Sequence, residues 1–130
     1  MTQEQKDLLL KDLCARQMYN VKCQVFNDTK PYTLSGVLHN KSYSQLYFEE
    51  LDWKEHDGFV CVKYCKPYLF PLSSMTDEQK KEFQSLIIQD AFGTSDNIFT
   101  PQDFYCKYHL DYRDLIPMGL AKDATGLNIY

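Results

Sequence analysis

The spacing of the apolar residues changes twice along the chain, and these changes restrict the kind of fold that it can form. Leu9, Leu10 and Leu13 recur at helical spacing. From Val21 onward apolar and polar residues alternate, which is typical of half-buried strands, and helical spacing returns after Thr76. A helix, a run of strands joined by short turns and further helices together predict an α+β fold.

Two helices are also predicted from their start signals. Thr2 is followed by Gln5 and Thr76 by Gln79, and each pair is a capping box, in which a hydroxyl and an amide satisfy backbone N–H groups. The stretches "MTQEQK" and "MTDEQK" around these pairs are nearly the same. We interpret them as shared helix-start signals, because the segments that follow have little in common beyond their apolar character.

Helical regions are expected at residues 1–17, 76–92 and 100–120, and the last region gives one or two helices that begin at Thr100-Pro101. The two or three C-terminal helices should cover one face of the sheet. Residues 121–130 have no strong pattern and are expected to form a tail. The side chains expected on the buried faces of the first two helices are Leu9, Leu10, Leu13, Cys14, Phe83, Leu86, Ile87 and Ala91.

Residues 21–72 predict a curled antiparallel β-meander of four to five strands. Strands are expected at residues 21–25, 32–39, 44–49 and 59–65. Gly36 lies inside the second strand, where glycine often marks a bend or a bulge. Pro67 and Pro71 cannot donate a backbone hydrogen bond, which predicts an extended segment at a sheet edge. This order of elements is similar to that of small SH3-like and Sm-like barrels, so closure into a barrel is an alternative.

The length and composition are typical of an ordinary globular protein. A chain of 130 residues is predicted to form one domain, and its ten tyrosines and eight phenylalanines indicate a core built partly from rings. No apolar run approaches the roughly 20 residues of a membrane span, and the polar N-terminus lacks signal-peptide features, so we expect a cytoplasmic protein without a membrane partner. The five cysteines follow no zinc or disulfide spacing, so we expect buried free thiols, no metal and no cofactor.

The charge distribution bears on nucleic-acid binding. The formal net charge is −4, and the acidic excess lies in residues 76–130. Nucleic-acid binding usually depends on a basic stripe, and the sequence shows none, so nucleic acid is not expected as a partner. Tyr43 and Tyr47 share one strand face and could stack on bases, although we favour packing beneath a helix. A small nucleic-acid-binding barrel remains the alternative function.

Motifs of catalysis are absent from the sequence: it has no glycine-rich phosphate loop, no G-x-S-x-G and no H-E-x-x-H. The nearest catalytic pairing is Cys106 with His109, three residues apart on the predicted third helix. A cysteine hydrolase built on this pair is a remote alternative, and we favour a buried cysteine beside a partly exposed histidine. We therefore expect a protein that is not an enzyme.

Two groups of residues form the candidate interaction surface. Glu49, Glu50 and Glu55 surround Trp53 at a predicted hairpin tip, where acidic side chains around an aromatic anchor could dock on a basic protein surface. The other interpretation is a solvated tip with the tryptophan folded back. Tyr68 and Phe70 alternate with Leu69 and Leu72, which are expected to face the core. If Tyr68 and Phe70 are exposed they form a contact surface; we favour a buried structural joint.

Two segments carry a resemblance to a known group of proteins. "CKPYLFPLSSMTDEQKKEF" (65–83) resembles a K-P-Y-L-R-P-L/M-S-S-M-T segment, and "HLDYRDLIPMGLA" (109–121) resembles H-F-D-Y-R-G-L-I-x-x-G-L-A. Both occur in small hypothetical proteins encoded by gut Bacteroidales and their phages. The resemblance implies a mobile-element setting and no particular activity. Phe70 stands where these proteins often have arginine, and Asp114 stands where glycine is usual, so a helical backbone is expected after Arg113.

These observations predict a non-enzymatic protein-interaction module of phage or mobile-element origin. Its partner is expected to be a protein, such as a host factor that it binds and inhibits. Self-association through an exposed edge strand stays open as an alternative.

Overall fold

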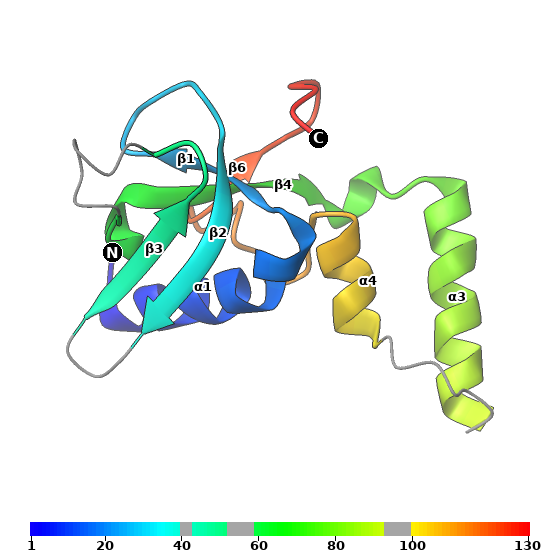
Figure 1. Ribbon diagram of the computed structural model, residues 1–130. Coiled ribbons are helices and arrows are strands. Elements are labelled where there is room, and N and C mark those ends of the chain that lie inside the picture. The colour runs from blue at the N-terminus through cyan, green and yellow to red at the C-terminus, as the bar shows by residue number, and fades with distance from the viewer. Residues whose placement is uncertain (40–42, 52–58, 93–99) are drawn as a thin grey trace.

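The computed structural model describes residues 1–39, 43–51, 59–92 and 100–130, without the side chains of residues 89–92 (Figure 1). The helices and 3₁₀ turns are α1 (Gln3–Arg16), η1 (Gln17–Tyr19), η2 (Val62–Tyr64), η3 (Leu72–Ser74), α3 (Asp77–Phe92) and α4 (Pro101–Lys107). The strands are β1 (Lys22–Val25), β2 (Tyr32–His39), β3 (Ser44–Phe48), β4 (Cys65–Pro71), β5 (Leu110–Asp111) and β6 (Lys122–Asp123). The predicted α+β class, with an N-terminal helix, a sheet and C-terminal helices, is confirmed.

Helix α1 begins at the predicted capping box. The Gln5 backbone N–H donates to Thr2 Oγ1 at 3.1 Å, and the Thr2 N–H donates to Gln5 Oε1 at 2.9 Å. The same two distances recur between Thr76 and Gln79 at the start of α3, which confirms that the repeated stretch is a helix-start signal.

The face of α1 that packs on the sheet is only partly as predicted. Leu9, Leu10 and Leu13 are buried in the core, but Cys14 is exposed. Asp12 and Arg16 are fully buried instead, because they pair with each other and bond to Arg113 and Leu110 near the other end of the chain.

In the described part of the chain the sheet has six strands; five follow the order β3-β2-β1-β4-β5, and β6 pairs separately with β4. The pairs β1–β2, β1–β4 and β2–β3 are antiparallel, as expected. Strands β5 and β6 run parallel to β4, so the sheet is mixed and the purely antiparallel meander is corrected. Helix α1 covers one face of the sheet (Figure 1), and the core lies between them.

The register between β2 and β3 shifts between Leu34 and Gly36, which confirms the predicted irregularity at this glycine. The outer edge of β3 receives one further contact, an isolated bridge between Leu46 and Val60. Within the described residues no ladder joins the two ends of the strand path, so closure into a barrel is not confirmed.

The prediction of a strand at residues 59–65 is wrong. Val62–Tyr64 form the turn η2, and the strand is β4, shifted toward the two prolines. Strand β4 lies inside the sheet rather than at its edge. Its bonds to the C-terminal segment come from other residues: the Phe70 N–H donates to His109 O at 2.8 Å, and Leu69 O accepts from Ala124 N at 2.8 Å. Pro67 and Pro71 are tolerated because these contacts require no donor from them.

The C-terminal part differs most from the expectation of a helical region at 100–120 and a tail at 121–130. Helix α4 starts with proline at its first turn, as predicted, but ends at Lys107. Residues 110–111 form β5 instead, and Lys122–Asp123 form β6. The tail is part of the fold, because it pairs with β4 and carries the buried Ala124.

Helix α3 stands beside α4 and away from the sheet (Figure 1). Phe83 packs on α4, with ring centroids 5.1 Å from Phe104 and 5.2 Å from Tyr105. Ile87, which was expected on the buried face, is 44% exposed. Ile87 is exposed because, among the described elements, α3 packs mainly against the short helix α4. Among the described helices, none combines the length and apolar character that a membrane span requires.

Candidate functional site

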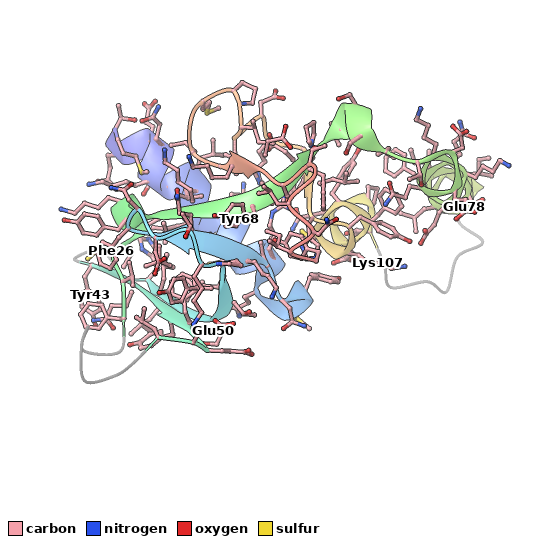
Figure 2. The ribbon with its side chains drawn as sticks, turned by 90° about the horizontal axis from the view of Figure 1, so that it is seen from above. Phe26, Tyr43, Glu50, Tyr68, Glu78 and Lys107 are labelled. Carbon is pink, nitrogen blue, oxygen red and sulfur yellow. The ribbon has the colours of Figure 1, made fainter. Side chains whose placement is uncertain are left out.

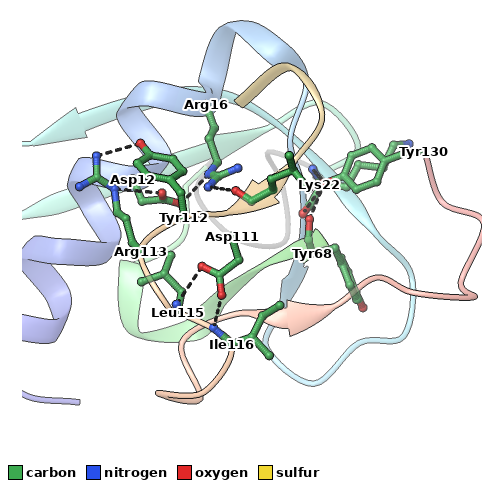
Figure 3. A network of polar contacts seen from close by, with 11 residues as sticks. Asp12, Arg16, Lys22, Tyr68, Asp111, Tyr112, Arg113, Leu115, Ile116 and Tyr130 are labelled. Atoms are coloured by element: carbon green, nitrogen blue, oxygen red, sulfur yellow. Dashed lines mark hydrogen bonds and ion pairs between the residues drawn. The ribbon is translucent and has the colours of Figure 1, made fainter. Parts of the chain in front are cut away.

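The segment 109–121 lies beside a buried ion pair (Figure 3). Arg16 Nε lies 2.7 Å from Asp12 Oδ2, and both side chains are completely buried. Arg16 Nη2 donates to the Leu110 backbone oxygen at 2.6 Å. Burying two charges is costly unless their hydrogen bonds are made, so this contact helps to explain why the pair is tolerated.

Arg113 and Tyr112 complete the network. Arg113 Nε lies 3.2 Å from Asp12 Oδ1, and Arg113 Nη2 donates to the Tyr112 hydroxyl at 2.9 Å. The guanidinium groups of Arg16 and Arg113 lie 5.2 Å and 4.7 Å from the centroid of the Tyr112 ring. Arg16 Nη1 is buried without a hydrogen-bond partner, so this ring is a favourable neighbour for its charge.

Asp111 holds the turn that follows. Its two carboxylate oxygens accept the backbone N–H groups of Leu115 and Ile116, each at 2.9 Å. Asp114, within this turn, has a φ of 58°, so the expected helical backbone after Arg113 is wrong. A left-handed conformation explains why glycine suits this position. The D-Y-R part of the segment is thus a structural anchor between α1 and the C-terminal residues.

A cleft of about 500 Å³ opens at the base of α3. Its volume falls within the range of small-ligand pockets. Its walls come from the end of β4, the start of α3, the end of α4 and the C-terminal residues. The lining residues are Phe70, Ser74, Thr76, Gln79, Lys107, Tyr108, His109, Leu110, Thr125, Gly126 and Tyr130.

His109 and Tyr130 form one wall of this cleft. Their rings stack with centroids 3.7 Å apart, and the Tyr130 hydroxyl accepts the Lys22 N–H and donates to Tyr68 O, each at 2.8 Å. Burial, with the Arg16 charge as a lesser cause, lowers the pKa of His109 to about 4. Burial raises the pKa of the Tyr130 hydroxyl. Both groups are therefore neutral near pH 7.

The environment of Cys106 and His109 does not favour an activated nucleophile and base. Cys106 is 1% exposed, and burial raises the pKa of its thiol. Because burial also lowers the pKa of His109, both groups favour their neutral forms. A reactive cysteine needs the opposite, a thiolate stabilised by a nearby positive charge such as a protonated imidazole.

The acidic part of the predicted interaction surface is only partly described. Glu49 is exposed, whereas Trp53 and Glu55 lie outside the described residues. The Glu50 carboxylate accepts the Thr33 N–H at 2.6 Å and the Thr33 hydroxyl at 2.7 Å. Partial burial raises the pKa of Glu50, but these hydrogen bonds outweigh it and leave the pKa below its usual value. Glu50 therefore has a structural role in joining β2 to the end of β3.

The proline-bearing segment is mostly a joint. Leu69 is fully buried, as expected, and Tyr68 is 7% exposed, so Tyr68 offers a partner very little surface. Phe70 is half-buried, and its ring lies 5.9 Å from that of Tyr130. Leu72, which was expected to face the core, is exposed because the chain leaves the sheet at η3.

Helix α3 has an apolar side that is exposed. The sequence predicts this apolar side, but it does not predict whether the side is buried in the core or exposed. Ile87 and Ile88 are 44% and 55% exposed, and Leu86 is half-buried. The helix is held near its middle by Glu82, which accepts from Lys107 Nζ at 3.2 Å and from the Tyr108 hydroxyl at 2.6 Å. The helix is thus fixed to α4 near its middle and presents isoleucines beyond that contact.

Tyr47 on β3 and Tyr43 just before this strand differ in environment. Tyr47 is half-buried, with its ring 6.4 Å from that of Phe59, and Tyr43 is 49% exposed. The described elements place no helix over this face, so the expected packing beneath a helix is not seen.

No group of three His, Cys, Asp or Glu side chains in the described part of the chain could hold a metal ion. In comparisons with known proteins, no family model, curated protein or solved structure matches the chain. A function for the chain therefore has to be inferred from the geometry of the residues described above.

Proposed function

We propose that this chain is a non-enzymatic protein-interaction module that binds another protein through helix α3. The observation that carries the proposal is the exposure of Ile87 and Ile88 on a helix whose main contact is α4. Burying a large aliphatic side chain on binding contributes roughly 1.5–3 kcal/mol. Two such neighbours provide an anchor of the kind that a groove in a partner protein recognises.

The face offered to the partner continues an existing apolar stripe. Phe83, Leu86 and Ile87 have the i, i+3, i+4 spacing of one helix face, and Phe83 is already packed on α4. The partner would extend this packing toward the end of the helix. The cleft at the base of α3 lies beside the same contact, because Thr76 and Gln79 line it.

The proposal includes a phage or mobile-element origin, a cytoplasmic location and a host protein as the partner. The two segments that resemble phage-encoded proteins support this origin. The neutral, buried Cys106 supports a role in binding rather than in catalysis.

The test compares two double variants of the tagged chain in a host lysate. Ile87→Asp with Ile88→Asp places two charges on the apolar face, while Gln84→Asp with Ser85→Asp adds the same charge at two exposed polar positions of the same helix. We expect the wild type and the polar-face variant to retain one stoichiometric partner, which the apolar-face variant loses. Equal capture by all three proteins would refute a role for α3. Light scattering of the purified chain shows whether the partner is a second copy.

A further inference from the structure

A second surface, at the end of the molecule opposite α3, carries exposed rings among lysines. Phe26 is 44% exposed and Tyr64 is 43% exposed, and their ring centroids lie 5.0 Å apart. They line a groove of about 250 Å³ together with Asn27, Lys63 and Lys66. Figure 2 places Phe26 at one end of the molecule and Lys107 and Glu78 at the other.

The backbone holds the two rings together. The Phe26 N–H donates to Tyr64 O at 2.8 Å, which extends the pairing of β1 with β4 by one residue. Phe26 has a φ of 56°, a left-handed conformation that residues with a side chain rarely adopt. Because both rings are held on paired backbone segments, less conformational entropy is lost when a ligand binds to them.

Among the described residues that line the groove, the charged ones are both lysines. Lys63 Nζ lies 4.9 Å from the centroid of the Tyr64 ring, and Lys66 lies on β4 beside it. Neither lysine forms a salt bridge with any described acidic side chain. The neighbouring Asp28 does not line the groove, and its carboxylate accepts from the Tyr32 hydroxyl at 2.7 Å and the Lys30 N–H at 3.1 Å.

We infer that this groove binds single-stranded nucleic acid, with a base stacked on the Phe26–Tyr64 pair and the adjacent phosphates near Lys63 and Lys66. Rings flanked by cations are the combination that binds single strands without sequence preference. An amide such as that of Asn27 can in addition donate to or accept from a base edge. The basic site is invisible as a stripe in the sequence because its residues come from two separate segments, 26–27 and 63–66.

The inference goes beyond the proposed function, because it assigns a different ligand to a different surface. The test measures the fluorescence anisotropy of labelled oligomers of about ten thymidines or uridines with the intact purified chain. We expect binding that weakens as salt rises from about 50 to about 200 mM, with a slope of log K against log salt near −1.4 for two phosphate contacts.

Variants assign the binding to the groove. Tyr64→Ala should weaken binding about 5- to 150-fold, the effect of losing one stacked base. Tyr43→Ala removes an equally exposed tyrosine elsewhere and should change nothing. Phe26→Ala should weaken binding, whereas Phe26→Trp keeps a stacking ring and should preserve it. Binding by the tryptophan variant shows that the loss of affinity in Phe26→Ala comes from the missing ring.

The charge contribution has its own matched control. Lys63→Gln with Lys66→Gln should bring the salt slope close to zero, whereas Lys80→Gln with Lys81→Gln removes the same net charge from α3 and should leave the slope unchanged. Three results would each overturn the inference: no binding at low salt, equal losses in both lysine pairs, or polyglutamate binding as tightly as the oligonucleotides with the same residue dependence. The last result would assign the groove to an acidic protein segment.

Discussion

Replacing Asp12 with asparagine tests the buried network most sharply, because it removes one charge and almost no volume. Asp12 is the only described carboxylate paired with Arg16, and both side chains are fully buried. After the substitution Arg16 keeps its bond to Leu110 O and its contact with the Tyr112 ring, but its charge is no longer balanced. Arg113 is 15% exposed and can turn partly to water.

The expected cost follows from this geometry. Breaking a buried ion pair from one side typically costs about 3–5 kcal/mol. With a urea m-value of about 2 kcal/mol/M, a loss of about 4 kcal/mol lowers the unfolding midpoint by about 2 M. Far-UV circular dichroism in a urea titration measures this shift directly.

Glu82→Gln provides the control, because it breaks an ion pair with Lys107 whose side chains are 44% and 55% exposed. An exposed pair of this kind contributes at most about 1 kcal/mol. Equal midpoints for Asp12→Asn and Glu82→Gln would refute the reasoning. A second check is the double variant Asp12→Leu with Arg16→Met, which leaves no unbalanced Arg16 charge and should be more stable than Asp12→Asn.

Three further predictions concern the turn, the cleft and the sheet. The free energy of unfolding should be about 1 kcal/mol higher for the Asp114→Gly variant than for Asp114→Ala, because glycine adopts the left-handed φ at 114 without strain. Equal stabilities of the two variants in urea titrations would contradict this prediction. The pKa of His109 is about 4 in the folded chain against 6.5 as its ordinary value, so the unfolded chain binds more protons between these values. Stability should therefore fall as the pH drops from about 6.5 to about 4, and the His109→Asn variant should show a smaller fall in urea midpoint over that window; the same fall in both proteins would argue against a buried neutral imidazole. Glu50→Ala should lower the unfolding free energy by about 1 kcal/mol through loss of the Thr33 bonds, and the matched Glu49→Ala should have no effect; equal effects would mean that the Thr33 contacts contribute little.

Local signals predicted the parts of this fold that depend on local structure. The caps at Thr2 and Thr76, the helix start at Thr100-Pro101 and the alternation in β1 and β3 needed no information about distant residues. Strand β4 was misplaced because its parallel partners lie around residues 110 and 122, and a proline argues against an interior strand unless those partners are known.

The polar core was missed for a related reason. A charged residue in a helix is predicted to be exposed unless the groups that compensate its charge are known. For Arg16 and Asp12, such groups lie in residues 110–113. The resemblance proposed for "HLDYRDLIPMGLA" singles out this segment as a unit, but it does not predict what the segment contacts. Similarly, the stripe on α3 predicts an apolar face but not whether that face is covered by the same chain or by another.

Of the predicted interaction surface, the structure describes Glu49, Glu50, Tyr68 and Phe70. Of these, Tyr68 is buried and Phe70 is half-buried, whereas Glu49 and Glu50 are exposed and Glu50 in addition binds Thr33. The surfaces that carry the proposals, Ile87–Ile88 and Phe26–Tyr64, depend on exposure in the folded chain. Exposure of this kind cannot be predicted from apolar spacing alone.

The most direct test of the central claim is photocrosslinking from α3 in a host lysate. A benzophenone amino acid at Ile88 is compared with the same residue at the exposed Ser35 on β2. We predict one crosslinked protein from position 88 and none from position 35, with the crosslink suppressed by excess wild type but not by the Ile87→Asp, Ile88→Asp variant. The same products from both positions, or suppression by both competitors, would contradict binding through α3.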